Sequence, residues 1–188
     1  MDSFSFSKLT IFCFRRSKLT YPAAFTGKTR EIHLDGQAFF DIHKNPHKPF
    51  IVHTSEMEVQ ALGTAFEVFD YDIESKSETV LLNGKVKIGI NNSKGDRAEF
   101  ILSPNEKMVY DQQADSAYVL TVNADKYTSW RKQKIVSFEN EKLSMIIPRL
   151  EQWYGPYDVH FLENSRIGRY LQVSSNFFRL TARYVHRL

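Results

Sequence analysis

Cysteine is almost absent from this sequence of 188 residues, and long apolar runs are missing as well. Cys13 is the single cysteine, so the chain can form no intrachain disulfide and no cysteine-based zinc site. No stretch reaches the roughly 18 consecutive apolar residues of a membrane-spanning helix, so we expect no transmembrane segment in this chain. The apolar patch at residues 9–14 precedes Arg15 and Arg16, the reverse of the order in a signal peptide.

An excess of charge of either sign is also missing. The 25 basic and 22 acidic residues are interspersed and leave a net charge of +3. This balance gives no electrostatic reason to expect a nucleic-acid partner. We interpret a weak basic cluster near the end as an anomaly of the chain terminus; it consists of Arg166, Arg169, Arg179, Arg183 and Arg187.

Aromatic residues are plentiful, and the spacing of apolar residues indicates β-structure. The 15 Phe and 9 Tyr fit a pleated, half-buried surface. Apolar residues alternate with polar ones over residues 30–42, and Gly36 stands where a bulge or tight bend is expected. Further strands are expected at intervals of about 8–12 residues, at 50–54, 57–61, 66–69, 79–82, 86–90, 99–103, 107–110 and 117–122. This pattern predicts an all-β sandwich or barrel-like stack.

One turn carries a more specific prediction. Asn83-Gly84 lies directly between two predicted strands, and both residues tolerate positive φ. The dipeptide therefore predicts a hairpin in which the strands before and after it pair with each other.

A single helix is expected near the C-terminus. Leu143, Ile147 and Leu150 recur at helical spacing, with Trp153 or Tyr154 completing the stripe. Asn140 is a candidate cap, and Gly155 with Pro156 would end the helix. Pro148 inside the segment predicts a kink or a late start. A short strand is expected before it at 135–138, whereas no regular period is visible after Tyr170.

The sequence contains no convincing catalytic or metal-binding pattern. His43 and His47 are four residues apart, but Pro46 between them opposes a helix that would place both on one face. Carboxylate pairs such as Asp70 and Asp72, or Glu56 and Glu58, have the spacing of any solvated strand edge; no Gly-x-Ser-x-Gly elbow or phosphate-binding glycine loop is present. We predict no catalytic residue, no metal site and no cofactor.

Two apolar motifs allow more than one interpretation. In Gly63-Thr64-x-Phe66, glycine would permit a bulge or close backbone approach and Phe66 would anchor the core; contact with a partner is the alternative. Phe39 and Phe40 cannot both point inward on a regular strand, so one of them would lie at a bulge, face a neighbouring subdomain or be an exposed contact residue. Trp153 and Tyr154 belong either to a core stripe or to a partner groove.

Four blocks of the sequence resemble the FecR domain of Bacteroidetes-type anti-sigma regulators, in matching order and spacing: 21–41, 49–54, 59–68 and 80–86. Farther along, Trp130, residues 138–140, Leu143 and residues 150–155 are similar to the small C-terminal domain of the family. We expect the motif residues within the blocks to be structural: Gly36, Phe39, Phe40, Pro49, Phe50, Gly63, Thr64, Phe66, Gly84 and Val86. Trp153 and Tyr154 are candidate partner contacts.

This resemblance implies a regulator rather than an enzyme. Members of the family relay a signal from a TonB-dependent outer-membrane transducer to an extracytoplasmic-function sigma factor, often for iron-carrier or glycan uptake. The implied partner is the transducer's signalling domain, at the periplasmic face of the inner membrane. A sigma factor would be reached only through a cytoplasmic segment absent from this chain. A carbohydrate- or ligand-binding periplasmic β-sandwich is the alternative, and would show exposed Trp or Tyr on one sheet face.

The expected fold is mainly β: a β-sandwich or jelly-roll/β-helix-like FecR domain with a small, incomplete C-terminal α+β subdomain. The predicted division is an atypical N-terminal segment (1–16), a FecR-like all-β domain (17–124), a linker (125–134), a partial α+β subdomain (135–170) and an atypical tail (171–188). Because the resemblance fails at both ends, our hypothesis is a truncated or frame-shifted reading of a longer gene.

Overall fold

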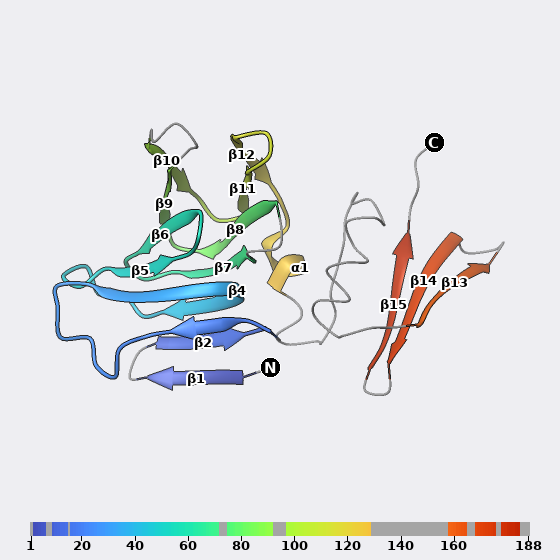
Figure 1. Ribbon diagram of the computed structural model, residues 1–188, viewed down its shortest axis with the longest axis horizontal. Helices are drawn as coiled ribbons and strands as arrows, with labels where there is room; N and C mark the ends of the chain where they lie inside the picture. Colours follow the sequence, from blue (N-terminus) through green and yellow to red (C-terminus); the bar gives the residue numbers. More distant parts are fainter. Residues whose placement is uncertain are drawn as a thin grey trace. The chain divides into compact units, whose positions relative to one another are not determined.

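The computed structural model describes residues 2–6, 9–14, 16–71, 75–91, 97–128, 158–164, 168–175 and 178–184. The chain divides into two units, Met1–Thr128 and Ser129–Leu188. The described residues of both units lie mainly in strands (Figure 1). Within the described residues, no helix is long and apolar enough to cross a membrane.

The first unit contains twelve strands and one short helix. They are β1 (Asp2–Phe6), β2 (Leu9–Cys13), β3 (Lys18–Thr20), β4 (Arg30–Ile42), β5 (Phe50–His53), β6 (Met57–Ala61), β7 (Ala65–Asp70), β8 (Lys76–Asn83), β9 (Val86–Asn91), β10 (Arg97–Leu102), β11 (Glu106–Asp111), β12 (Ser116–Thr121) and α1 (Ala124–Thr128). The prediction of a mainly β fold is confirmed.

The strands form one curled sheet whose main path runs β10-β9-β6-β5-β4-β7-β8-β11-β12. The 13-residue strand β4 belongs to both halves of the curl. Its first part pairs with β3 and, in parallel, with β5; its second part pairs with β2 and β7. We call the half with β3, β5, β6, β9 and β10 the first layer, and the half with β1, β2, β7, β8, β11 and β12 the second layer (Figure 1).

Gly36 lies where β4 passes from one layer to the other. Its φ is +127°, and a Cβ at this position would lie 2.6 Å from the Cα of Ser17. The Ser17 hydroxyl donates to the carbonyl of Gln37 at 2.9 Å and accepts the Gln37 N–H. Only glycine fits this combination of positive φ and close approach without strain.

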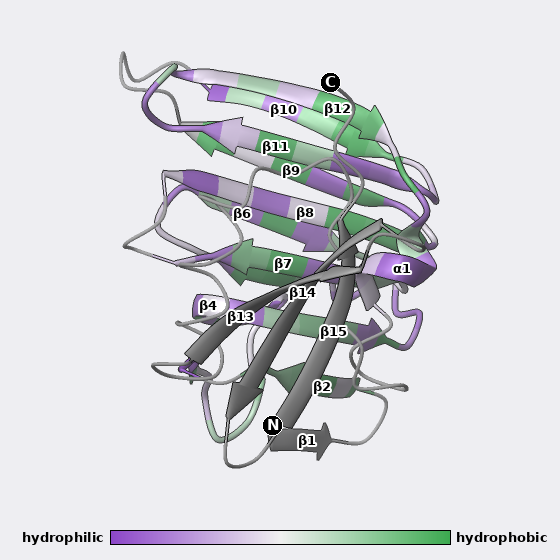
Figure 2. Cartoon of the chain, turned by 90° about the vertical axis from the view of Figure 1, so that its right-hand side faces the viewer, coloured by the Kyte–Doolittle hydropathy of each residue, from purple (hydrophilic) through white to green (hydrophobic). Residues whose placement is uncertain are grey.

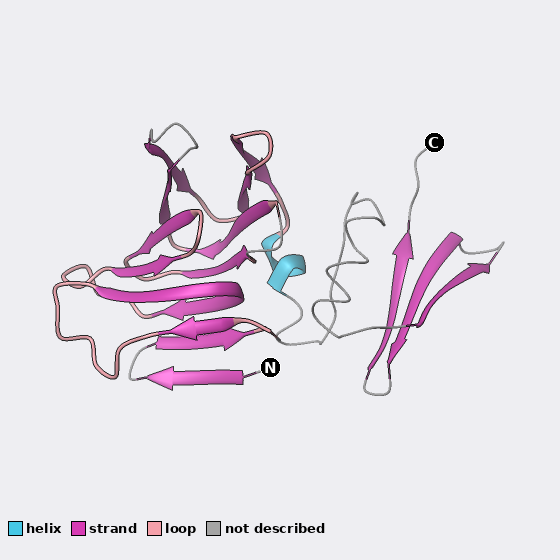
Figure 3. Ribbon diagram, viewed as in Figure 1, coloured by secondary structure: helices cyan, strands magenta, loops and turns pink. Residues whose placement is uncertain are grey.

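The chain alternates between the layers in pairs of strands. Antiparallel β5–β6 and β9–β10 lie in the first layer, and β7–β8 and β11–β12 lie in the second. Residues 62–64, 84–85 and 103–105 connect one layer to the other (Figure 3). We call the end of the unit formed by these three connections the crossing end.

The predicted Asn83-Gly84 hairpin is therefore wrong. The strand before the dipeptide, β8, pairs with β7 and β11, whereas the strand after it, β9, pairs with β6 and β10. Gly84 has the positive φ expected of a turn, at +91°, but Asn83 does not share it. A two-residue hairpin of type I′ needs positive φ at both central residues, so the dipeptide makes a corner between layers instead.

The apolar residues that alternate along the strands meet between the layers. Phe40 packs on Phe50 and Phe66, with ring centroids 5.8 and 5.1 Å apart. Residues from nine of the strands complete the core, among them Leu9, Ile11, Ile32, Leu34, Val52, Val59, Val68, Leu81, Val86, Ile88, Leu102 and Met108. Each large side chain buried in this way contributes roughly 1.5–3 kcal/mol.

Both Phe39 and Phe40 are buried, at 1% and 0% exposure. Consecutive strand residues point to opposite faces, so Phe40 fills the core while Phe39 lies on the outer face of the second layer. There its ring centroid is 6.4 Å from that of Phe12. The alternative of an exposed contact residue at this motif is excluded, because neither ring is exposed.

The second unit contains three described strands, β13 (Asp158–Asn164), β14 (Gly168–Ser175) and β15 (Phe178–Tyr184), paired antiparallel in this order. Strand β14 runs across the boundary predicted at residues 170 and 171, and β15 lies in the segment predicted as an atypical tail. The helix predicted over residues 143–154 and the strand at 135–138 lie outside the described residues.

Candidate interaction surfaces

The Gly63-Thr64 motif lies at the crossing end, against residues 42–45. The Ile42 N–H donates to the Thr64 carbonyl at 2.9 Å, and the Thr64 N–H donates to the Ile42 carbonyl at 3.0 Å. A Cβ on Gly63 would lie 2.4 Å from the Cα of Lys44. Glycine at this position therefore allows two backbone segments to touch.

Gly84, in the connection from β8 to β9, packs against the same two residues. A Cβ there would lie 2.6 Å from Cγ2 of Thr64 and 2.8 Å from the Gly63 carbonyl oxygen. The three motif residues Gly63, Thr64 and Gly84, separated by up to 21 positions in the sequence, thus form one contact. Besides Gly36, Phe39 and Phe40, which are described above, the other motif residues lie elsewhere: Phe50, Phe66 and Val86 in the core and Pro49 before β5.

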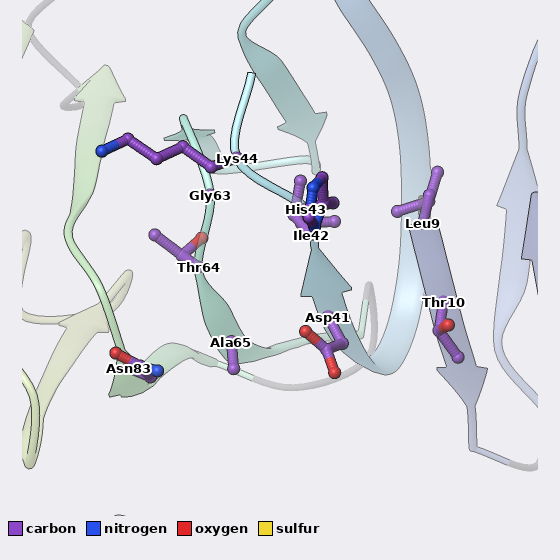
Figure 4. Close-up of a pocket in the computed structure, with 10 residues that line it drawn as sticks. All are labelled: Leu9, Thr10, Asp41, Ile42, His43, Lys44, Gly63, Thr64, Ala65 and Asn83. Atoms are coloured by element: carbon purple, nitrogen blue, oxygen red, sulfur yellow. The ribbon is translucent and has the colours of Figure 1, made fainter. Parts of the chain in front are cut away.

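A groove of about 340 Å³ opens beside this contact (Figure 4). It is lined by Leu9, Thr10, Asp41, Ile42, His43, Lys44, Gly63, Thr64, Ala65 and Asn83. Its ionisable groups are one carboxylate, one imidazole and one amine, on Asp41, His43 and Lys44. Acid–base catalysis by paired carboxylates needs two such groups, and this groove supplies only one.

Among the residues that the structure describes, the hydroxyl of Thr64 has no hydrogen-bond partner, although the residue is only 5% exposed. Its methyl group packs against Gly84. An unpaired buried hydroxyl costs about 1–3 kcal/mol. Since the oxygen atom itself has no accessible surface, a ligand in the groove would not reach it in this conformation.

Arg30 and Phe50 join the entry of β4 to that of β5. The guanidinium carbon of Arg30 lies 5.6 Å from the Phe50 ring centroid. The Arg30 Nε donates to the Lys48 carbonyl at 3.0 Å, and the backbone N–H of Arg30 donates to the Pro49 carbonyl at 2.8 Å. Burial lowers the pKa of Arg30 from its ordinary value. These contacts place Pro49 and Phe50 where the entries of β4 and β5 meet.

Asp70 is a buried carboxylate that accepts hydrogen bonds from both layers. It is 1% exposed, and burial raises its pKa despite several donors. Ser77 Oγ donates to its Oδ1 at 2.9 Å, while the Glu56 N–H donates to its Oδ2 at 3.4 Å. Because Glu56 lies in the β5–β6 turn and Ser77 in β8, Asp70 links the two layers rather than serving a cleft.

The histidines of the first layer form a surface row with acidic neighbours. The rings of His33 and His53 stack with centroids 5.1 Å apart, and His53 Nε2 lies 3.3 Å from Glu31 Oε2. A hydrogen bond from Thr29, followed by that of His53, lowers the pKa of Glu31. His43 and His47 are exposed in the loop between β4 and β5. Among the residues that the structure describes, no three His, Cys, Asp or Glu side chains are grouped as metal ligands.

Exposed apolar residues mark a surface that sequence reasoning missed. Ile101 of β10 is 62% exposed, and Tyr118, Val119 and Leu120 of β12 are 43%, 39% and 44% exposed. Strands β10 and β12 end the main path of the sheet and lie at the same end of the unit (Figures 1 and 2). The sequence predicts both strands. It does not predict that they are edge strands, because the order of strands in the sheet depends on where the chain crosses between the layers.

The structure bears on two other interpretations of the sequence, the glycan-binding alternative and the candidate partner contacts. Among the described residues, the exposed large aromatic side chains are Tyr21, after β3, and Tyr118, in β12. They form no aromatic platform of the kind that a glycan site on one sheet face would need. Trp153 and Tyr154, the candidate partner contacts, lie outside the described residues.

The fold and these surfaces define a class: a two-layered all-β module whose exposed features suit contact with other molecules. Residues 13–87 match the family model described as FecR protein. This part of the chain is therefore similar to a FecR domain, and the predicted resemblance to FecR-type anti-sigma factors is confirmed.

Solved structures give the same result. Two crystal structures of a putative anti-sigma factor from Parabacteroides distasonis are similar to this chain. The structure at 1.65 Å resolution has 25% identity and a TM-score of 0.75, covering 81% of this chain and 70% of its own. The structure at 2.50 Å has 18% identity and a TM-score of 0.76, covering 98% of this chain and 94% of its own, and shows the shared fold. A comparison with curated proteins gives no match.

Proposed function

We propose that this chain is the extracytoplasmic part of a transmembrane anti-sigma factor. It receives a signal from the signalling domain of a TonB-dependent outer-membrane transducer and passes it to an extracytoplasmic-function sigma factor. The observation that supports this proposal is the FecR domain over residues 13–87, combined with the fold shared with an anti-sigma factor candidate. The regulated genes would serve uptake of iron carriers or glycans.

The described surfaces suit such a role. The core is sealed between the layers, and the groove at the crossing end holds one carboxylate, on Asp41, rather than a converging pair. Binding to another protein needs complementary surface and few hot-spot residues, often aromatic. Trp153 and Tyr154 are the proposed contact with the transducer.

The direct test is a binding measurement between the full chain and the purified signalling domain of the transducer encoded beside it. We expect binding, and we expect Trp153→Ala and Tyr154→Ala to weaken it by about tenfold or more, as for aromatic hot spots. Tyr21→Ala is the matched control, because Tyr21 is an exposed tyrosine in the first unit. Absence of binding by the intact chain would contradict the proposal.

A second test addresses the output. Deleting the gene in its native host should change transcription from promoters of the neighbouring sigma factor, and the full-length gene should restore it. Protease added to spheroplasts should digest this part of the protein, as expected at the periplasmic face of the inner membrane. Unchanged transcription together with full protection would refute both the signalling role and the location.

A further inference from the structure

Asn83 and Gly84 are exposed where the chain crosses from β8 to β9. Asn83 is the one asparagine of the sequence that is followed by glycine, and its side chain lines the groove at the crossing end (Figure 4). Among the residues that the structure describes, no hydrogen bond involves the Asn83 carboxamide or the Gly84 N–H. The two groups that react in asparagine deamidation are therefore adjacent, accessible and not held by other groups.

The pairing of β8 is irregular just before Asn83. Ala65 of β7 pairs with Asn83, but the next residue, Phe66, pairs with Leu81, so Leu82 is left as a bulge. On its other side, β8 pairs with β11 only as far as Leu81. A bulge disrupts the hydrogen-bond ladder locally. The backbone of Asn83 is therefore held by fewer strand contacts than the residues that precede the bulge.

We propose that Asn83 is a site of spontaneous deamidation in the folded protein. The Gly84 nitrogen loses its proton to a base in the solvent and attacks the side-chain carbonyl carbon of Asn83. The bond from that carbon to the side-chain nitrogen breaks, the nitrogen takes up a proton and leaves as ammonia, and a five-membered succinimide ring remains. Water then opens the ring. Attack on the former side-chain carbonyl gives aspartate, and attack on the backbone carbonyl gives isoaspartate.

Glycine at position 84 leaves the attacking nitrogen uncrowded, because it has no Cβ. Asn105, in the connection between β10 and β11, is the contrasting case. It is also exposed, but Glu106 follows it and its carboxamide oxygen accepts the Ala124 N–H at 3.3 Å. The side chain of Glu106 crowds the nitrogen that would attack, and the hydrogen bond holds the carboxamide. Asn105 should therefore be converted much more slowly than Asn83.

The isoaspartate product does not fit the corner that Gly84 forms. Isoaspartate lengthens the backbone by one methylene carbon directly before Gly84. A Cβ on Gly84 would lie 2.6 Å from Cγ2 of Thr64 and 2.8 Å from the Gly63 carbonyl oxygen, so the corner has no space for an additional carbon on this side. Close-packed regions respond to a change of even one methylene. Isoaspartate should therefore displace the corner, whereas aspartate keeps the length of the backbone.

Peptide mapping by mass spectrometry tests the site in the full chain. Trypsin should release residues 77–85, whose only asparagine is Asn83, and residues 98–107, whose only asparagine is Asn105. After incubation of the folded chain at mildly alkaline pH, the first peptide should gain one dalton in a fraction of molecules many times larger than the second. Asn83→Gln should abolish this gain, because its side chain would have to form a six-membered ring. A parallel incubation in guanidinium chloride reports on the unfolded chain. Conversion of Asn83 only in the unfolded chain, equal conversion of both asparagines in the folded chain, or an intact Asn83 in both would overturn the proposal.

Urea denaturation tests the effect of the product on the corner. The incubated protein should show an additional transition at a lower urea concentration than the wild-type midpoint. The amplitude of this transition should equal the fraction of isoaspartate, which protein isoaspartyl methyltransferase measures. Asn83→Asp is the matched control: it has the new charge with a backbone of normal length and should unfold at the wild-type midpoint. A single transition at that midpoint, or an equal loss of stability in Asn83→Asp, would refute the displacement of the corner by the added carbon.

Discussion

In the core of the first unit, Phe40 packs between Phe50 and Phe66, whereas at the crossing end Gly63 and Gly84 leave no space for any side chain. Both regions are buried or closely packed, but their stability depends on different features of the packing. In the core, stability depends on the volume of apolar side chains. At the crossing end it depends on the absence of one carbon atom. A substitution that removes atoms should therefore damage the core, and one that adds an atom should damage the crossing end.

The largest effect is expected for Phe66→Ala. Phe66 is fully buried and stacks on Phe40, so truncation loses apolar burial and leaves a cavity. Such substitutions cost about 3–5 kcal/mol. Urea denaturation followed by circular dichroism would measure the loss. Ile101→Ala is the control, since Ile101 is 62% exposed and should change the free energy of unfolding by less than about 0.5 kcal/mol. Equal effects of the two would show that the described core is incorrect.

The crossing end should respond to an added methyl group. Gly84→Ala forces a side chain into positive φ and against the Gly63 carbonyl oxygen at 2.8 Å. Strain of this kind costs about 1–3 kcal/mol. Gly27→Ala is the matched control, because nothing lies within 4 Å of its Cβ position. The same denaturation experiment should show a loss for Gly84→Ala alone, and a neutral Gly84→Ala would mean that this corner is not tightly packed.

The core and the crossing end also differ in how far the sequence predicts them. The alternation around Phe40 follows directly from the two-residue period of a strand, so the core and the mainly β fold were predictable. The order of strands was not, because Asn83-Gly84 has the same local preferences in a hairpin as in a corner between layers. The order of strands also decides which residues lie on an edge strand of the sheet, as Tyr118 and Leu120 do. The contact of Gly63 with Lys44 joins segments from different strands and leaves no periodic signal.

The smallest effect concerns Asp70, a buried polar residue that belongs to neither region. Burial raises its pKa, so the folded state holds the proton more tightly than the unfolded chain does. The stabilisation from this carboxyl is complete below its unfolded pKa and is lost as the pH rises through its folded pKa. Asp70→Asn carries no titrating proton. Its single amide oxygen can still accept the hydrogen bond from Ser77, whereas its NH2 group cannot accept the long bond, 3.4 Å, from the Glu56 N–H. The variant should differ from wild type by less than about 1 kcal/mol at pH 7.

The sign of the pH dependence separates this explanation from a general effect of acid. Asp70→Asn should gain stability relative to wild type as the pH rises. Asp111→Asn should instead lose stability relative to wild type as the pH rises. Hydrogen bonds from the Ala114 N–H and then from Lys76 lower the pKa of Asp111. That carboxylate therefore stabilises the fold above its unfolded pKa, and this stabilisation is lost as the pH falls through its folded pKa. Urea denaturation of the three proteins between about pH 3 and pH 7 spans the ordinary carboxylate range. Parallel curves for the two variants would show that Asp70 is hydrated rather than held between the layers.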